Sequence, residues 1–228
     1  MMDFLSFVPW DDHNAEVWSP RLASLLINIG SSIDSTFKTF RNSRQLADGD
    51  MAKELREKSE PNIGDYAATY GSVFPFASKV VYLLADHSAL TPWKDWASLK
   101  PGEKVSPSWW TAYNQVKHDR FANSQLATLR TGLIALAGFF AVCVLVTEIR
   151  EHLYCLGVIH HVGSETRGGI HRMQVLMPQG WLEVARLKDS SEPFYLPVYV
   201  DTSRFALFLS SDKNVAGQRE LLDSIAPR

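Results

Sequence analysis

Cysteine is scarce in this chain, with only two among its 228 residues. Cys143 and Cys155 lie twelve positions apart, in or beside one apolar segment. Twelve residues of helix rise about 18 Å, which is too far for a disulfide to bridge. We therefore expect both thiols to be reduced and the protein to be cytoplasmic.

An excess of either charge is also missing. The chain has 23 Lys and Arg residues against 25 Asp and Glu residues, for a formal net charge of −2. This balance excludes the strongly basic proteins that hold nucleic acid by bulk attraction, and it leaves room for a local basic patch. The first seven residues carry no basic side chain before their apolar ones, so we expect no secretory signal peptide.

The chain also lacks a hydrophobic run of clear membrane-spanning length. Residues 131–147 form the longest uncharged run, and its seventeen positions fall below the roughly 20 that a membrane-spanning helix needs. Several of its residues are small, among them Gly132 and Gly138, which suits close packing between helices. We expect a buried helix here, and a short membrane-spanning protein is the weakest of three functional hypotheses.

Hydrophobic residues make up 46% of the chain, which is enough to build a core. A serine followed by a proline is a favourable helix start, and it precedes two predicted helices, 20–41 and 106–120. In the first of these, apolar residues recur at steps of three and four. A third predicted helix, 125–153, is apolar nearly all round its middle, which is typical of a central buried helix.

Strand patterns occur in two places. Residues 79–84 are β-branched and aromatic, so we predict a strand or hairpin over about 78–96, inserted between helices. Residues 158–211 hold β-branched runs split by Gly and Pro. The predicted fold is therefore mainly α, an antiparallel helical bundle over 1–157 with a small β-containing C-terminal extension over 158–228.

The second serine–proline start opens a helix that concentrates polar side chains. Tyr113, Lys117 and Arg120 share one side of it, at steps of four and three. Asn114 and His118 are four apart on the adjacent stripe. A histidine can act as acid or base near neutral pH, an amide can orient it, and Lys and Arg side chains can hold a phosphate.

A structural interpretation of the same helix stays open. Trp109, Trp110 and Tyr113 are equally suited to a core. Lys117 and Arg120 are equally suited to a solvated edge near the helix C-terminus, where the helix dipole favours cations.

The first helix offers a further cation. Asp34 and Lys38 are one turn apart beside its apolar stripe. They could face His118 across the bundle, or they could form an exposed pair four residues apart.

The stretch Trp-Trp-x-Ala-Tyr-Asn-x-Val-Lys-His-Asp-Arg over 109–120, followed by a long apolar helix of small residues, resembles proteins of the HEPN type (higher eukaryote and prokaryote nucleotide-binding domain). The family's motif is an arginine, a polar residue that is often Asn, and a His four to six positions after the arginine. Asn114 and His118 match this motif, and Tyr113 stands in place of the arginine.

The resemblance implies a helical bundle, often a homodimer, found in bacterial toxin and phage-defence settings. Many such proteins are ribonucleases that use no metal and no cofactor. The leading hypothesis is therefore binding of RNA or a nucleotide phosphate, with metal-independent cleavage as its extension. Its residues are catalytic His118 and Asn114, and substrate-binding Lys117, Arg120, Tyr113 and Lys38. The alternative is a catalytically degenerate helical module that dimerises or binds another protein, because Tyr113 replaces the arginine.

A metal site is not expected. His160, His161 and His171, with Cys155, match no structural zinc spacing. The glycine-rich stretch 164–169 is neither a P-loop nor a dinucleotide fingerprint, so a turn is the simplest interpretation.

Overall fold

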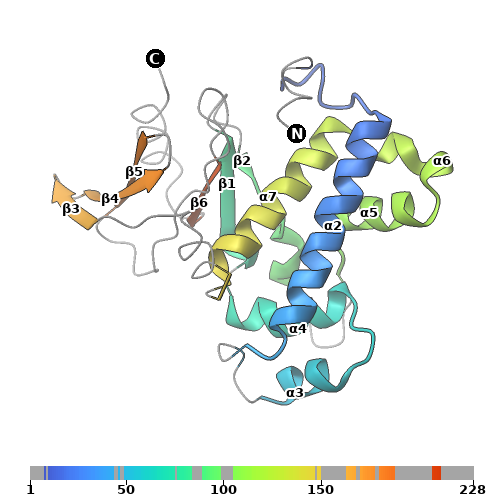
Figure 1. Cartoon of the computed structure of the whole chain (residues 1–228), viewed down its shortest axis with the longest axis horizontal. Coiled ribbons are helices and arrows are strands. Elements are labelled where there is room, and N and C mark those ends of the chain that lie inside the picture. Colours follow the sequence, from blue (N-terminus) through green and yellow to red (C-terminus); the bar gives the residue numbers. More distant parts are fainter. Residues whose placement is uncertain are drawn as a thin grey trace. The chain divides into compact units, whose positions relative to one another are not determined.

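The computed structural model describes residues 8, 10–43, 46, 49–74, 76–83, 89–98, 105–146, 148–149, 163–167, 170–177, 180–187 and 207–211. The chain forms two compact units, one of residues 1–77 and 92–139 and the other of residues 78–91 and 140–228. Helices dominate the described residues (Figure 1), which confirms the predicted mainly α class. The predicted boundary between 1–157 and 158–228 stays a prediction.

The central helix of the first unit is α2, Pro20–Phe40. It begins as predicted, because Ser19 accepts a hydrogen bond from the Leu22 amide at 3.1 Å and Pro20 occupies the first turn. Its buried side carries Leu22, Ala23, Leu26, Ile29, Gly30, Ile33 and Phe37. Burial of each large apolar side chain contributes about 1.5–3 kcal/mol, so this stripe anchors the helix in the unit.

Two shorter helices follow, α3 (Asp50–Glu57) and α4 (Ile63–Val73). Asn62 and Asp65 form a capping box at the start of α4. Rings of α4 belong to an aromatic cluster to which the 3₁₀ turns η1 (Phe76–Ser78) and η2 (Lys94–Ser98) also contribute. The ring contacts link Phe37, Tyr66, Tyr70, Phe74, Phe76, Trp93, Trp96 and Trp109. These rings are buried, so the cluster is part of the core of the first unit.

The motif region forms α5 (Ser108–His118) and a short α6 (Arg120–Asn123). The predicted helix 106–120 is therefore too long at its C-terminal end. Asp119 breaks it by taking an extended conformation, with φ −143° and ψ 91°, and its carboxylate caps α6 by accepting from the Ala122 amide at 3.0 Å.

The apolar helix α7, Leu129–Leu145, starts later than the predicted 125–153 because Ser124–Leu126 form a 3₁₀ turn, η3. The backbone of the N-terminal segment holds its first turn, as Leu129 N donates to Val17 O at 2.8 Å. Within the described part of the chain, no helix has both the length and the apolar character needed to cross a membrane.

Two small antiparallel sheets belong to the second unit. Strand β1 (Lys79–Leu83) pairs with β2 (Ala89–Leu90) and with β6 (Leu207–Ser211), and Val81 lies opposite both Leu90 and Leu209. Strands β3 (Gly163–Arg167), β4 (Ile170–Met177) and β5 (Gly180–Leu187) form the other sheet in that order. The predicted hairpin insertion and the β-containing C-terminal part are thus confirmed.

Candidate functional site

The aromatic half of α5 is core. Trp109, Trp110, Tyr113 and Val116 are its buried residues. The Trp109 indole nitrogen donates to Pro92 O at 2.8 Å. The exposed residues Ser108, Thr111 and Gln115 line the opposite side of α5, and the last two residues of the helix, Lys117 and His118, are both exposed.

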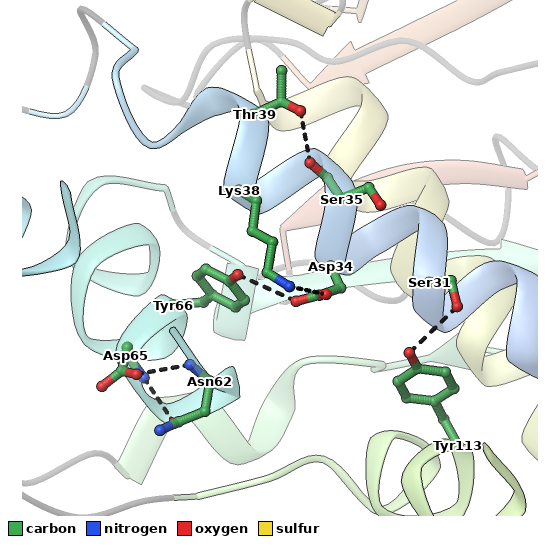
Figure 2. A network of polar contacts seen from close by, with 9 residues as sticks. All are labelled: Ser31, Asp34, Ser35, Lys38, Thr39, Asn62, Asp65, Tyr66 and Tyr113. Atoms are coloured by element: carbon green, nitrogen blue, oxygen red, sulfur yellow. Dashed lines mark hydrogen bonds and ion pairs between the residues drawn. The ribbon is translucent and has the colours of Figure 1, made fainter. Parts of the chain in front are cut away.

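Tyr113 locks α5 against α2. Its hydroxyl lies 3.4 Å from Ser31 Oγ, as Figure 2 shows. Its ring lies so close to Gly30 that a Cβ placed there would come within 2.4 Å of the ring carbon Cδ2. The residue at the position of the family's arginine is thus a buried packing residue, 1% exposed, in a cradle that only glycine permits.

The polar residues Asn114, Lys117 and His118 lie at the C-terminal end of α5. Lys117 and His118 are exposed, and Asn114 is half-buried. The Lys117 ammonium lies 5.5 Å from the centre of the Tyr113 ring, which places it by a cation–π contact. Among the described residues, neither the His118 ring nor the Asn114 amide has a hydrogen-bond partner, so both can bind a ligand.

Arg120 makes structural contacts. Its Nη2 donates to Pro20 O and to Ser24 Oγ, and so joins α6 to the first turn of α2. These bonds, with the Tyr113–Ser31 contact, show that α5 and α2 run antiparallel. The predicted phosphate-binding role of Arg120 would have to use the other guanidinium nitrogens.

Asn123 performs a role that the sequence analysis did not find. Its Nδ2 donates to Gln115 O at 3.1 Å and to Asp119 O at 3.0 Å. It thereby covers two carbonyls at the end of α5, where the negative end of the helix dipole would otherwise repel an anion. Asn side chains often cap helices from within or just before them, but the helix whose end Asn123 covers precedes it in the chain, which no local pattern indicates.

Lys38 lies elsewhere. Its ammonium donates to Asp34 Oδ2 at 2.7 Å, and the Tyr66 hydroxyl donates to Asp34 Oδ1 at 3.2 Å (Figure 2). Lys38 follows Ser24, the partner of Arg120, by fourteen residues, or about 21 Å along the helix axis. The structure therefore does not bring Lys38 to His118.

Burial, above all, and then the negative charge of Asp34 raise the pKa of Tyr66 well above its usual range. The phenol stays neutral and keeps donating to Asp34. With Lys38 on the other oxygen, the carboxylate of Asp34 has a partner on each side, which makes this a structural network at the α2–α4 contact.

A metal centre finds no support in the described residues, which contain no group of three or more His, Cys, Asp or Glu side chains placed to hold an ion. Cys155, His160 and His161 lie outside the described residues, and so does the glycine-rich pair at 168–169. Cys143 is a free thiol, and burial raises its pKa to about 12, which disfavours the thiolate form at neutral pH.

No protein-family model, no curated protein and no solved structure matches this chain. The resemblance to HEPN proteins therefore rests on the residues of α5 and the helix that follows it.

Proposed function

We propose that this chain binds RNA through a phosphate at the C-terminal turn of α5, and that it is a HEPN-like, metal-independent endoribonuclease of the toxin or phage-defence kind. The observation that supports this is the pairing of exposed Lys117 and His118 at the end of a helix whose other side is anchored in the core by Trp109, Trp110, Tyr113 and Val116. The core fixes the helix, so the side chains of Lys117, His118 and Asn114 project from a rigid backbone before a ligand arrives.

Lys117 is the phosphate ligand of the proposed site. Its contact with the Tyr113 ring restrains a side chain that would otherwise lose several rotamers on binding. Asp119, the nearest acidic residue in the sequence, accepts a hydrogen bond from the Ala122 amide. That bond turns the carboxylate toward α6 and lowers its competition with a phosphate for Lys117.

His118 is the proposed acid–base group. Neutral imidazole takes the proton of a ribose 2′ hydroxyl as that oxygen bonds to phosphorus. The same proton goes to the 5′ oxygen as the bond from phosphorus to that oxygen breaks, which leaves a 2′,3′-cyclic phosphate and a free 5′ hydroxyl. The half-buried Asn114, one turn earlier, donates to a phosphate oxygen.

Tyr113 limits the rate of this reaction. A buried phenol cannot supply the charge that the family's arginine places on the phosphate. We therefore expect RNA binding to be easier to detect than cleavage. By the same resemblance we propose a homodimer, and from the spacing of the two cysteines we place the protein in the cytoplasm.

The test is to incubate the purified protein with end-labelled RNA, with and without EDTA. Wild type should bind, and its cleavage products should end in cyclic phosphate by mass spectrometry in both conditions. His118→Ala should lose about 10²- to 10⁴-fold in cleavage and little in binding. Lys117→Ala should bind about 10- to 150-fold more weakly, since a charge-assisted hydrogen bond contributes about 1.5–3 kcal/mol.

The matched control is Lys53→Ala, which removes another exposed helical lysine, on α3, and should leave both activities unchanged. Absence of binding and cleavage by the wild type would refute the proposal. Light scattering that shows a dimer without RNA binding would favour the interaction module.

A further inference from the structure

Phe121 is 98% exposed, the most exposed of the large apolar side chains in the described residues. The next most exposed large apolar side chains, Trp18 and Met51, are 50% exposed. Phe121 lies on α6, which buries none of its four residues, so packing of the core does not explain why a phenyl ring stands here.

The backbone around Phe121 is nevertheless held from both sides. On one side Arg120 donates to Pro20 O and Ser24 Oγ. On the other, Asn123 donates to the carbonyl of Asp119 at 3.0 Å. The ring is thus presented to solvent on a turn that is already ordered. Binding a ligand therefore costs less conformational entropy of the protein than binding on a flexible turn would.

Basic side chains precede Phe121 in the chain, and the one carboxylate among them, Asp119, accepts a hydrogen bond from the Ala122 amide. Phe121 follows His118 by three residues, at most about 11 Å of extended chain, and Lys117 is exposed one residue earlier. Aromatic rings beside cations are the arrangement by which proteins hold single-stranded nucleic acid, because a base stacks on the ring while its phosphate meets the cation. A duplex keeps its base faces stacked inside and cannot use the ring.

We infer that Phe121 is a base-stacking platform, and that the ligand of the α5–α6 turn is single-stranded RNA whose phosphate is held by Lys117 beside His118. This inference rests on the proposed function and specifies its substrate class. It assigns the ring a role that neither the fold nor the HEPN resemblance gives it.

Fluorescence anisotropy with labelled single-stranded oligouridylate and oligoadenylate, and with the duplex of the two, tests the inference. Phe121→Ala should weaken single-strand binding roughly 5- to 100-fold, the range of one lost base–aromatic stack. Phe121→Trp should bind as the wild type or more tightly, because it keeps an aromatic face. Met51→Ala, an exposed apolar control on α3, should change nothing.

Phe121→Ala that binds single strands as the wild type does would overturn the stacking role. If Lys117→Ala still weakens binding in that experiment, the proposed phosphate site stands although the stacking role of Phe121 does not. Equal binding of duplex and single strand would also overturn the inference. Wild type that binds neither single strand nor duplex would refute both proposals. If Phe121→Ala changes only the molecular mass measured by light scattering and not RNA binding, Phe121 belongs to a contact between protein chains.

Discussion

Among single residues, Tyr66 shows how a polar group is kept inside the first unit. Its hydroxyl donates to Asp34, and the same carboxylate accepts from Lys38 on its other oxygen. A buried phenol without an acceptor would lose its hydrogen bonds to water, at about 1–3 kcal/mol. The Asp34 pair thus serves the α2–α4 contact, and the exposed-pair interpretation of Asp34 and Lys38 is the one that the geometry matches.

Stability at high pH follows from Tyr66. Its pKa is raised in the folded state, so both states keep the proton below about pH 10, and above it the unfolded chain loses its proton first. The contribution of Tyr66 is therefore complete below pH 10 and is lost as the pH rises further. Tyr66→Phe should lower the free energy of unfolding by about 1 kcal/mol at pH 7 and should make its decrease above pH 10 less steep. Urea unfolding of wild type and variant from pH 7 to 11 measures both effects. An identical dependence of the unfolding free energy on pH in the two proteins would contradict the prediction.

Between elements, the contact of α2 with α5 decides where the candidate site lies. Gly30 admits the Tyr113 ring, and the antiparallel course of the two helices then brings the end of α5 to the start of α2. His118 is consequently carried away from the polar residues of the second half of α2. The same packing that excludes Lys38 from the site leaves Lys117 and His118 in solvent.

Gly30→Ala tests this packing. Its Cβ would meet the buried Tyr113 ring at 2.4 Å, and overpacking of this kind costs about 1–3 kcal/mol in the free energy of unfolding. The control is Gly71→Ala on α4, where the nearest atom, on Trp96, lies at an ordinary 3.6 Å. That variant should be neutral or up to about 1 kcal/mol more stable, from helix propensity.

Chemical denaturation of both glycine variants gives the comparison. Gly30→Ala combined with Tyr113→Leu should lose less stability than the two changes added together, because the smaller side chain relieves the clash. Strict additivity would mean that Gly30 and Tyr113 do not determine how α2 and α5 pack.

For the whole molecule, the net charge of −2 sets the expectation for salt dependence. Lys117 and Arg120 of the proposed site can neutralise one or two phosphates. The slope of log K against log salt for single-stranded RNA should then be about −0.7 to −1.4. Binding titrations at several salt concentrations measure it. A slope steeper than about −4 would show that a wider basic surface binds the RNA instead.

The amino-acid sequence alone determined the helical class, the start of α2 at Ser19 and the spacing that sets Asn114 one turn before His118. These depend on caps and on side-chain periodicity, which involve residues only a few positions apart. The end of α5 was missed by two residues, because the side chain of Asp119 suits a helix end or a helix start and only the fold selects between them.

Only the tertiary structure decided which side chains of the motif are free to act. The contacts of Tyr113 with Ser31 and of Arg120 with Pro20 join residues 82 and 100 positions apart. No local pattern specifies such partners, because they depend on how α2 and α5 pack. That packing buries Tyr113 in the core and engages Arg120 in hydrogen bonds to α2. It leaves Lys117, His118 and Phe121, which the sequence analysis did not single out, facing solvent.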